Sequence, residues 1–573
     1  MIPALLRTSA LAAAASLDPD ADVDVLVPTN NPAHGDYQWN FAFRMARARK
    51  ENPRALAERL LPFFAAHPGV AAAEVAGAGF VNLRLSDAWL AERLAEQAAA
   101  PGAALTPAGA GKTVVVDFSS PNVAKRMHVG HMRSTHLGHV LTNLHAAAGW
   151  KVIRDNHIGD WGTPFGKLIV AWDEWRDEAA YAADPVGELE RLYVKFGDEA
   201  SAKPGEGTPE AQERSRILQD RAREETAKLQ RGDARNRALW EDFRARSLEE
   251  YEAVYQRMGV RFDEVLGESE YGPMTDAVVE ELLAAGTAET SEGAVIVRLG
   301  EQVSVVRKKD GAATYTATDL ACVKYRVRRW SPERMVYVTD ARQHQHFMNF
   351  FAVAKRWGCT ADLVHMGFGM LKLPDGAMST RKGNVIRLVD LLDEAVARAR
   401  AVVDEKSASF PEAERAAIAE AVGVGAVRYQ DLVQAPTSDI TFDWKKMLAM
   451  DGNSAPYLLY ARARAASILR KAAADGGPGA AAVATLAHPL ERELALALLR
   501  LPEAVDGALR ASAPNLLAEG VYRACEAFNR FYFELKVLDE VEHRASRLAL
   551  VLAADRVLVH ALGLLGLRAL DRL

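Results

Sequence analysis

The sequence predicts a doubly wound α/β domain in the middle of the chain, with a small α+β domain before it and an all-α bundle after it. A chain of 573 residues is too long for one hydrophobic core. In the middle of the chain, short β-branched runs alternate with longer helical stretches, which is typical of a parallel sheet covered by helices on both faces. From residue 411 to the end, the apolar spacing indicates helices throughout.

The first 105 residues are expected to form the α+β domain. Residues 53–66 have the spacing of an amphipathic helix, and residues 79–86 alternate apolar and polar side chains like a half-buried strand. Residues 98–111 are rich in small side chains and proline, which indicates a linker. The alanine-rich residues 1–16 run into an acidic segment without a clear cleavage site, so we expect a helix there rather than a signal peptide.

The central, Rossmann-like domain is expected over residues 112–400. Residues 113–118 (TVVVDF) form an almost continuous β-branched run, as a strand buried on both faces does. A loop follows, and a helix is expected to begin near Val129. Residues 152–153 and 335–338 are further strand candidates. The alternation of strand, loop and helix is what predicts the doubly wound sheet.

Two further regions of the chain are expected to be helical. Residues 177–258 are highly charged and indicate a helical insertion made of long, solvated helices without a chemical role. Residues 411–573 are expected to form the C-terminal helical bundle, since their end is rich in leucine, alanine and arginine. No apolar run is long and hydrophobic enough to predict a membrane span.

Charge and cysteine content exclude several classes of protein. The formal net charge of −6 argues against a strongly basic, non-specific nucleic-acid binder, although local basic faces can still bind RNA. The cysteines Cys322, Cys359 and Cys525 are far apart in sequence and none forms a C-x-x-C pair. The sequence therefore predicts neither a disulfide framework nor a zinc site, and it indicates a reduced, cytoplasmic setting.

The strongest local signal is residues 119–133, SSPNVAKRMHVGHMR. A buried strand ends just before it, and His128, Gly130 and His131 open the following helix. Free N–H groups and the positive end of the dipole make a helix N-terminus attractive to phosphate. The histidines, three positions apart, share one helical face, and glycine between them allows close approach to the backbone. The pattern predicts a site for ATP phosphates that stabilises charge at the α-phosphate.

This segment resembles the first signature of class I aminoacyl-tRNA synthetases, and the longer string PNVAK-x-x-HVGH-x-RS is similar to the arginyl family in particular. Further segments resemble that family in the same order along the chain: 31–40 with 50–53, VIRDNHIGDWGTPFG at 152–166, MSTRKGN at 378–384, and NSAPYLLYARARAASIL at 453–469. The resemblance implies a Rossmann-like catalytic domain, an N-terminal domain that contacts the tRNA elbow, and a C-terminal anticodon-binding domain.

The resemblance also implies a set of arginine-binding residues. A guanidinium presents a rigid fork of donors that carboxylates match, so Asp319, in the element TYTATD, is expected to pair with it. Tyr315 is expected to pack along the substrate side chain, and Glu268 is a weaker candidate for a second carboxylate. The other positions that match the family's amino-acid site are Ser120, Asn122, His131, Gln343 and, at the strand end beside them, Asp117.

The second signature loop departs from the usual K-M-S-K, since Ala377 and Thr380 replace its two lysines. Many arginyl enzymes without the last lysine have one upstream of the first signature, where this chain has Lys125. Lys125, His128 and His131 are therefore the predicted catalytic residues. The predicted ATP-binding residues are Gly130, His128, His131, Met378, Ser379 and Arg381, with Lys382 as a further helper.

For RNA, the resemblance favours Tyr457, Tyr460 and Arg464, because basic side chains bind phosphates and aromatic rings stack on splayed bases. A solvated helix face explains the arginines nearly as well. The implied reaction joins arginine to ATP as an adenylate with release of pyrophosphate, and then transfers arginine to tRNA(Arg) with release of AMP. Mg²⁺ is expected to come with ATP, no other metal site is expected, and the chain is expected to be a monomer.

Two other functions remain open from the sequence. A specialised duplicate would supply arginyl-tRNA to a pathway other than translation. A regulatory relic would bind tRNA without activating arginine, as the replacement of the loop lysine by Ala377 suggests. Against the relic, both signature histidines and Tyr315, Asp319 and Gln343 are present.

Overall fold

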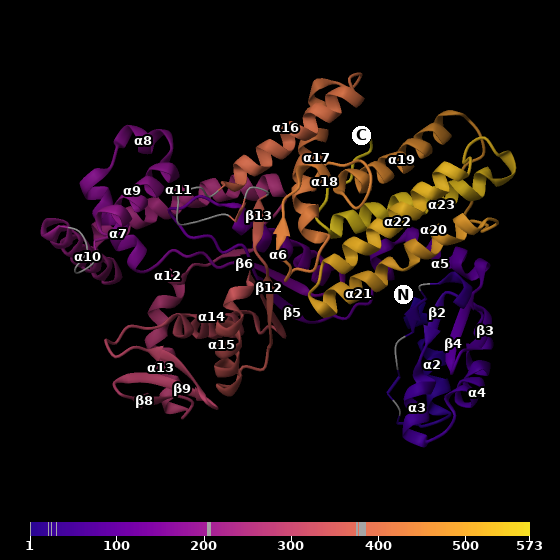
Figure 1. Cartoon of the computed structure of the whole chain (residues 1–573), viewed down its shortest axis with the longest axis horizontal. Coiled ribbons are helices and arrows are strands. Elements are labelled where there is room, and N and C mark those ends of the chain that lie inside the picture. The colour runs from indigo at the N-terminus through magenta and orange to yellow at the C-terminus, as the bar shows by residue number, and fades with distance from the viewer. Residues whose placement is uncertain are drawn as a thin grey trace. The chain divides into compact units, whose positions relative to one another are not determined.

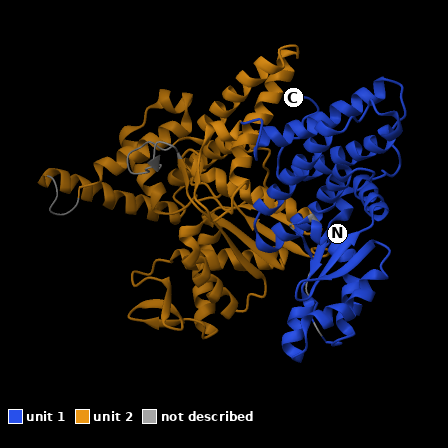
Figure 2. Ribbon diagram, turned by 45° about the vertical axis from the view of Figure 1, so that its right-hand side comes forward, with its two compact units in different colours: residues 1–107, 449–573 blue, residues 108–448 orange. Residues whose placement is uncertain are grey.

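The computed structural model describes residues 2–20, 22–23, 26–29, 31–202, 208–373, 376–377 and 386–573. The chain divides into two compact units (Figure 2). One contains residues 108–448, and the other joins residues 1–107 to residues 449–573.

The unit of residues 108–448 is built on a five-stranded sheet with the order β12-β11-β5-β6-β7, in which all pairs are parallel. The strands are β5 (Thr113–Asp117), β6 (Lys151–Asn156), β7 (Glu264–Val265), β11 (Arg334–Asp340) and β12 (Asp362–Phe368). The strand order reverses between β5 and β11, and ligands of such sheets bind beyond the carboxyl ends of the strands at that point. The predicted doubly wound sheet is confirmed, including the strands expected at 113–118, 152–153 and 335–338.

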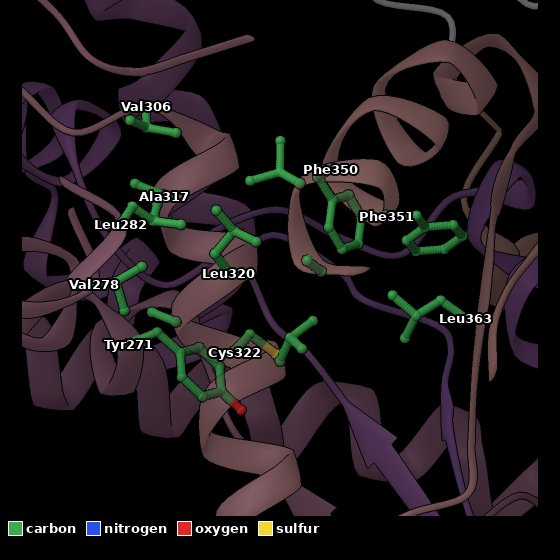
Figure 3. Packing of buried hydrophobic residues seen from close by; sticks show 14 of the residues in the cluster. Tyr271, Val278, Leu282, Val306, Ala317, Leu320, Cys322, Phe350, Phe351 and Leu363 are labelled. Carbon is green, nitrogen blue, oxygen red and sulfur yellow. The ribbon is translucent and has the colours of Figure 1, made fainter. Parts of the chain in front are cut away.

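Three helices flank this switch point: α6 (Val129–Ala147), α14 (Tyr315–Trp330) and α15 (His344–Arg356). Helix α6 begins at Val129, as the sequence predicts. Figure 3 shows how Leu320 and Cys322 of α14 pack in one buried cluster with Phe350 of α15 and Leu363 of β12. Burying such a side chain contributes about 1.5–3 kcal/mol. The cluster therefore fixes α14, which bears Tyr315 and Asp319, and α15, which Gln343 immediately precedes.

The predicted insertion, residues 177–258, is helical, with α8 (Glu178–Ala183), α9 (Pro185–Glu199), α10 (Pro209–Gln230) and α11 (Ala234–Met258) (Figure 1). The preceding helix α7 (Thr163–Trp175) packs against α9, α10 and α11. The interpretation of all the insertion helices as plain solvated surface is wrong for α11. Its residues Phe243, Ser247, Tyr251 and Tyr255, four positions apart, form one buried face. The many charged side chains on the other faces hide this stripe in the sequence.

The same unit contains two smaller sheets. The antiparallel sheet β10-β9-β8 consists of β8 (Glu289–Ser291), β9 (Ala294–Leu299) and β10 (Gln302–Arg307), and the sheet β14-β13-β15 consists of β13 (Leu371–Leu373), β14 (Gly376–Ala377) and β15 (Ile440–Thr441). The remaining helices are α12 (Glu268–Tyr271), α13 (Thr275–Ala284), α16 (Leu388–Lys406), α17 (Glu412–Leu432) and α18 (Trp444–Met447). Buried Arg133 of α6 donates to Asp431 of α17 and to the carbonyls of Gly369, Pro436 and Ser438, so it ties the sheet domain to these later helices.

The other unit combines the two ends of the chain. Its antiparallel sheet, of order β1-β2-β4-β3, consists of β1 (Val27–Pro28), β2 (Tyr37–Trp39), β3 (Val70–Ala76) and β4 (Phe80–Leu85). Helices α1 (Ile2–Leu5), α2 (Arg7–Ala15), α3 (Phe41–Arg49), α4 (Pro53–Ala65) and α5 (Asp87–Ala99) accompany it. The helix expected at 53–66 and the strand expected at 79–86 are confirmed.

The C-terminal helices of this unit are α19 (Ala455–Ala474), α20 (Pro489–Leu499), α21 (Leu501–Ala511), α22 (Asn515–Glu534) and α23 (Val541–Leu564). Arg492 of α20 pairs with buried Asp36 at 2.7 Å and also with Asp87, and the Tyr37 hydroxyl donates to Glu503 of α21. These contacts join the N-terminal sheet to the C-terminal bundle. None of the helices in the described ranges is both long and apolar enough to cross a membrane.

Candidate active site

The loop between β5 and α6 has a strained backbone. Ser119, Ser120 and Ala124 all have positive φ angles, of 75°, 51° and 62°. Non-glycine residues adopt this left-handed conformation only where surrounding contacts enforce it, and such residues cluster at functional sites. Ser119 N–H donates to Ser134 Oγ at 2.9 Å, and the Ser119 hydroxyl lies 2.8 Å from that of Tyr255 on α11. The loop is therefore held from both α6 and the insertion.

Ser247 of α11 provides a test of that support. Its hydroxyl accepts a hydrogen bond from the N–H of Ala124 at 2.9 Å in a buried position. Replacing Ser247 by alanine is expected to destabilise the fold by about 1–2 kcal/mol, because a buried donor loses its acceptor. Thermal or denaturant unfolding measures the loss. Ser201→Ala, at an exposed position of the same insertion, is the control, and equal stability of the two variants would contradict this account of the loop.

The two signature histidines have defined roles at the start of α6. His128 is the N-cap, and its Nδ1 accepts the N–H of Gly130 at 3.0 Å, while Nδ1 of His131 accepts the N–H of His128 at 3.1 Å. Each ring is therefore held with its proton on Nε2. The ring centroids lie 4.0 Å apart. The predicted shared face is thus a pair of rings in contact, and both offer an Nε2–H donor.

The environment keeps these rings neutral. Burial lowers the pKa of His131 to about 3, and the charges of His128 and Lys125 add to that effect. Burial and the nearby Lys125 also lower the pKa of His128. At neutral pH both rings can donate a proton in a hydrogen bond without carrying a charge. Lys125 lies close enough to bring a positive charge to the same place, so the structure gathers the three predicted catalytic residues.

Gly130 has a structural role that the sequence did not indicate. A Cβ on this glycine would lie 2.7 Å from Cε1 and 2.8 Å from Nδ1 of His128. The missing side chain thus leaves room for the imidazole ring, whereas the sequence argument expected it to leave room for a ligand. The approach of a ligand to the Gly130 backbone stays a prediction.

The segment that follows the second signature is hydrogen-bonded to the start of α6. Val129 N–H donates to Ile386 O at 3.2 Å, and Leu388 N–H donates to Met127 O at 2.9 Å. Ala377 ends β14, which pairs with β13. The predicted ATP-binding residues Met378, Ser379 and Arg381, together with Thr380 and Lys382, lie outside the described residues.

Asp117 and Ser120 lie at the carboxyl end of β5, and a buried arginine accompanies them. Arg326 of α14 donates to Asp117 at 2.6 Å and to Asp155 of β6 at 2.7 Å, while the Ser120 hydroxyl donates to Asp117 at 3.2 Å. The Asp117 carboxylate is thus already paired inside the protein. Sequence reasoning missed Arg326. The available signal was an arginine on the face of α14 where the spacing predicts an apolar residue.

The two predicted guanidinium carboxylates come together. Burial raises the pKa of Glu268, and the charges of Asp160 and Asp319 raise it further, against the effect of His157. Glu268 begins α12, and Asp319 lies one turn into α14. Tyr315, which begins α14, is 76% exposed, so its side chain is open to a ligand. Gln343, at the end of the 3₁₀ helix Ala341–Gln343, is also exposed.

Asn122 is fixed by its backbone while its side chain stays exposed. Its carbonyl accepts the Tyr251 hydroxyl at 2.7 Å, and it forms a bridge with Gly159 of the GDWG segment. A Cβ on Gly159 would lie 2.1 Å from Oδ1 of Asn122. This glycine is therefore needed for the placement of the Asn122 amide.

His346 is a second residue that the sequence did not indicate. Its Nε2 lies 2.6 Å from Oδ2 of Asp319, and this carboxylate raises the pKa of His346. A protonated imidazole occupies Asp319 and repels a guanidinium. We therefore expect the KM for arginine to fall as the pH rises through the pKa of His346. Steady-state assays between pH 6 and 8 measure this, and His346→Asn should flatten the profile; an unchanged slope in that variant would contradict the assignment.

In the other unit, Arg464 of α19 lies in an aromatic cluster. Its guanidinium carbon is 4.6 Å from the ring centroid of Tyr460, 4.5 Å from that of Tyr532 and 4.7 Å from that of Phe533. Phe533 is 70% exposed. Tyr457 instead packs on Tyr522, with centroids 5.7 Å apart. The sequence pointed to Tyr460 and Arg464 but missed the two rings that α22 adds.

Family models match three parts of the chain. The first, "tRNA synthetases class I (R), catalytic domain", matches residues 97–444. The "Arginyl tRNA synthetase N terminal domain" matches residues 5–85, and the "DALR anticodon binding domain" matches residues 458–573. The parallel sheet with its switch point and the histidine pair at the start of α6 thus define a class I aminoacyl-tRNA synthetase.

Individual relatives specify the family further. The chain is 42% identical to an arginine–tRNA ligase of Fusobacterium nucleatum, over 96% of this chain and 95% of the relative. It is 42% identical to that of Chloroflexus aggregans over 93% and 92%. Arginyl-tRNA synthetase of Thermus thermophilus superposes with a TM-score of 0.83 at 25% identity and covers 100% of both chains. The chain belongs to the arginyl-tRNA synthetase family, the enzymes that charge tRNA with arginine.

Proposed function

We propose that the chain uses ATP to join L-arginine to tRNA(Arg) through an arginyl-adenylate, for protein synthesis. The observation that carries the proposal is the pair of neutral Nε2–H donors on His128 and His131, with Lys125 beside them at the switch point of the sheet. Donors fixed in advance at the place where charge develops are the main source of catalysis in such transfers. No nucleophilic side chain is required, because the reaction depends on positioning.

Each side of the site has its own part in the reaction. The carboxylate of arginine attacks the α-phosphorus of ATP, and pyrophosphate leaves. His128, His131 and Lys125 bind the phosphate oxygens, with Met378, Ser379 and Arg381 contributing from the second signature. Asp319 and Glu268 bind the guanidinium, and Tyr315, Gln343, Ser120 and Asn122 surround the rest of the amino acid. The terminal ribose of tRNA then attacks the adenylate, and AMP leaves.

The same proposal extends to metal ions, oligomeric state and location in the cell. Among the described residues, no three histidine, cysteine or carboxylate side chains form a group that could hold a metal ion, so Mg²⁺ would be held mainly by ATP phosphates and water. We further propose that the chain needs no zinc, works as a monomer and acts in the cytoplasm.

The anticodon would stack on the aromatic cluster around Arg464. Phe533→Ala is expected to weaken tRNA binding by about 1–3 kcal/mol, the usual contribution of one stacked base. Filter binding and the KM for tRNA in aminoacylation measure the loss. Val541→Ala, which removes another exposed apolar side chain of the same unit, 79% exposed, is the control. Equal tRNA affinity in the two variants would remove the cluster from the proposed interface.

The decisive assay is arginine-dependent exchange of pyrophosphate into ATP, with and without total tRNA, and with lysine in place of arginine as the control. Exchange only with arginine supports the proposal, and a requirement for tRNA reveals coupling between the two sites. If folded protein binds tRNA but never exchanges pyrophosphate, the relic is favoured, and Ala377→Lys is the first variant to make. Exchange without charging of ordinary tRNA favours the specialised duplicate.

A further inference from the structure

Lys125 has no carboxylate partner at hydrogen-bond distance among the described residues; an aromatic ring lies against it instead. Its ammonium nitrogen lies 4.4 Å from the ring centroid of Tyr193 on α9. The backbone carbonyl of the same lysine accepts the Tyr251 hydroxyl of α11 at 2.7 Å. Two helices of the insertion therefore hold this one residue, α11 by the main chain and α9 by the side chain.

Tyr193 is itself firmly placed. It packs against the buried cluster of the insertion, which includes Leu189 and Leu192 of α9 and reaches Val123 and Ala124 of the signature loop. The next loop residue, Arg126, forms an ion pair with Asp184, the N-cap of α9. Helix α9 thus contacts the loop at both Lys125 and Arg126, and the ring belongs to the same packed body as the backbone that bears the lysine.

An aromatic ring suits a lysine that must bind phosphate. The face of the ring attracts the ammonium through its quadrupole and leaves the positive charge intact. A carboxylate in the same place would neutralise that charge and compete with ATP. Carboxylates are available nearby, since Glu190 acts on Lys125 and both Asp184 and Glu250 contact the adjacent Arg126. The Lys125 ammonium lies over the Tyr193 ring and forms no ion pair with any of the three among the described residues.

We propose that Tyr193 is a positioning residue for catalysis, which holds the Lys125 ammonium over its ring so that the lysine meets the ATP phosphates in place of the missing second-signature lysines. The inference rests on the proposed function and deepens it. It gives the helical insertion a part in ATP activation that neither its sequence nor its surface suggests.

The test compares Tyr193→Leu and Tyr193→Phe in the full-length chain. With saturating arginine and tRNA, kcat/KM for ATP in pyrophosphate exchange is expected to fall about tenfold in the leucine variant and to stay near the original value in the phenylalanine variant, which keeps the ring. The KM for arginine should not change in either. Val194→Ala, at a 57% exposed position on the same helix, controls for general damage to α9.

A double-mutant cycle with Lys125→Ala separates positioning from structure. If Tyr193 acts through Lys125, the leucine change causes no further loss once the lysine is gone. Equal losses with and without Lys125, or equal losses in the leucine and phenylalanine variants, would overturn the inference. So would unchanged kcat/KM for ATP in Tyr193→Leu. If the original chain shows no exchange at all, the proposed function itself has failed, which is a different result from a leucine variant that exchanges normally.

Discussion

Replacing Asp319 by asparagine is expected to weaken arginine binding by about 2–5 kcal/mol, because a buried guanidinium loses its carboxylate. The KM for arginine would then rise roughly 30-fold or more. Asparagine keeps the shape of the side chain, so the change isolates the charge. Glu268, whose pKa is raised by burial and by Asp319 among others, would remain as the nearby carboxylate. Arginine-dependent exchange at several arginine concentrations gives the KM.

The expected pattern distinguishes loss of a ligand from loss of structure. The KM for ATP should stay within a factor of about two, because Asp319 lies on α14 and the phosphate site lies at α6. Asp276→Asn, on exposed α13 surface where the carboxylate pairs with Arg307, is the matched control. An unchanged KM for arginine in Asp319→Asn would show that Asp319 does not bind the guanidinium.

Local sequence signals predicted the central strand and the helix that bears the first signature. The run at residues 113–118 is almost continuously β-branched, which fits a strand buried on both faces of a parallel sheet, and residues 113–117 form β5 between β6 and β11. The helix begins at Val129, where the histidine pair predicted it. These features depend on neighbouring residues in the chain, so periodicity and turn chemistry can reveal them.

Partners from distant elements could not be predicted in this way. Arg326 reaches Asp117 across 209 positions, and His346 reaches Asp319 across 27. Tyr255 of α11 meets Ser119 across 136 positions, from a helix whose charged faces conceal its buried stripe. Nothing in a single sequence states which residues of two separate elements will touch. The candidate site could thus be assembled as a set of ligands, while the groups that hold those ligands required the structure.

The packing of the two ends of the chain against each other also could not be predicted from the sequence. Residues 1–107 and 449–573 form one compact unit, held in part by the buried pair of Asp36 and Arg492, which lie 456 positions apart. A buried charge that loses its partner is costly, so this pair fixes the N-terminal sheet against α20. Composition and linker signals divide a chain into segments, but they contain no information about which segments pack together.

Gly130→Ala is expected to separate activity from stability at the histidine pair. The new Cβ would lie 2.7 Å from the His128 ring, so the ring must turn and its Nδ1 can no longer accept the Gly130 N–H. Misplacing one such donor costs about 3 kcal/mol of transition-state stabilisation, or on the order of 100-fold in kcat. Alanine favours the helix by about 0.5–1 kcal/mol over glycine, and this gain roughly offsets the cost of about 1 kcal/mol for the lost cap hydrogen bond, so the melting temperature should change little while exchange falls.

Gly197→Ala is the matched control for that prediction. Gly197 lies in α9, and a Cβ there would meet nothing within 4 Å. The two variants make the same chemical change in a helix and differ only in what the added methyl group touches. Gly197→Ala should keep full activity with equal or greater stability. If Gly130→Ala also exchanges pyrophosphate at the original rate, the placement of the His128 ring is not what activates ATP, and Lys125 with the second signature must provide the phosphate contacts instead.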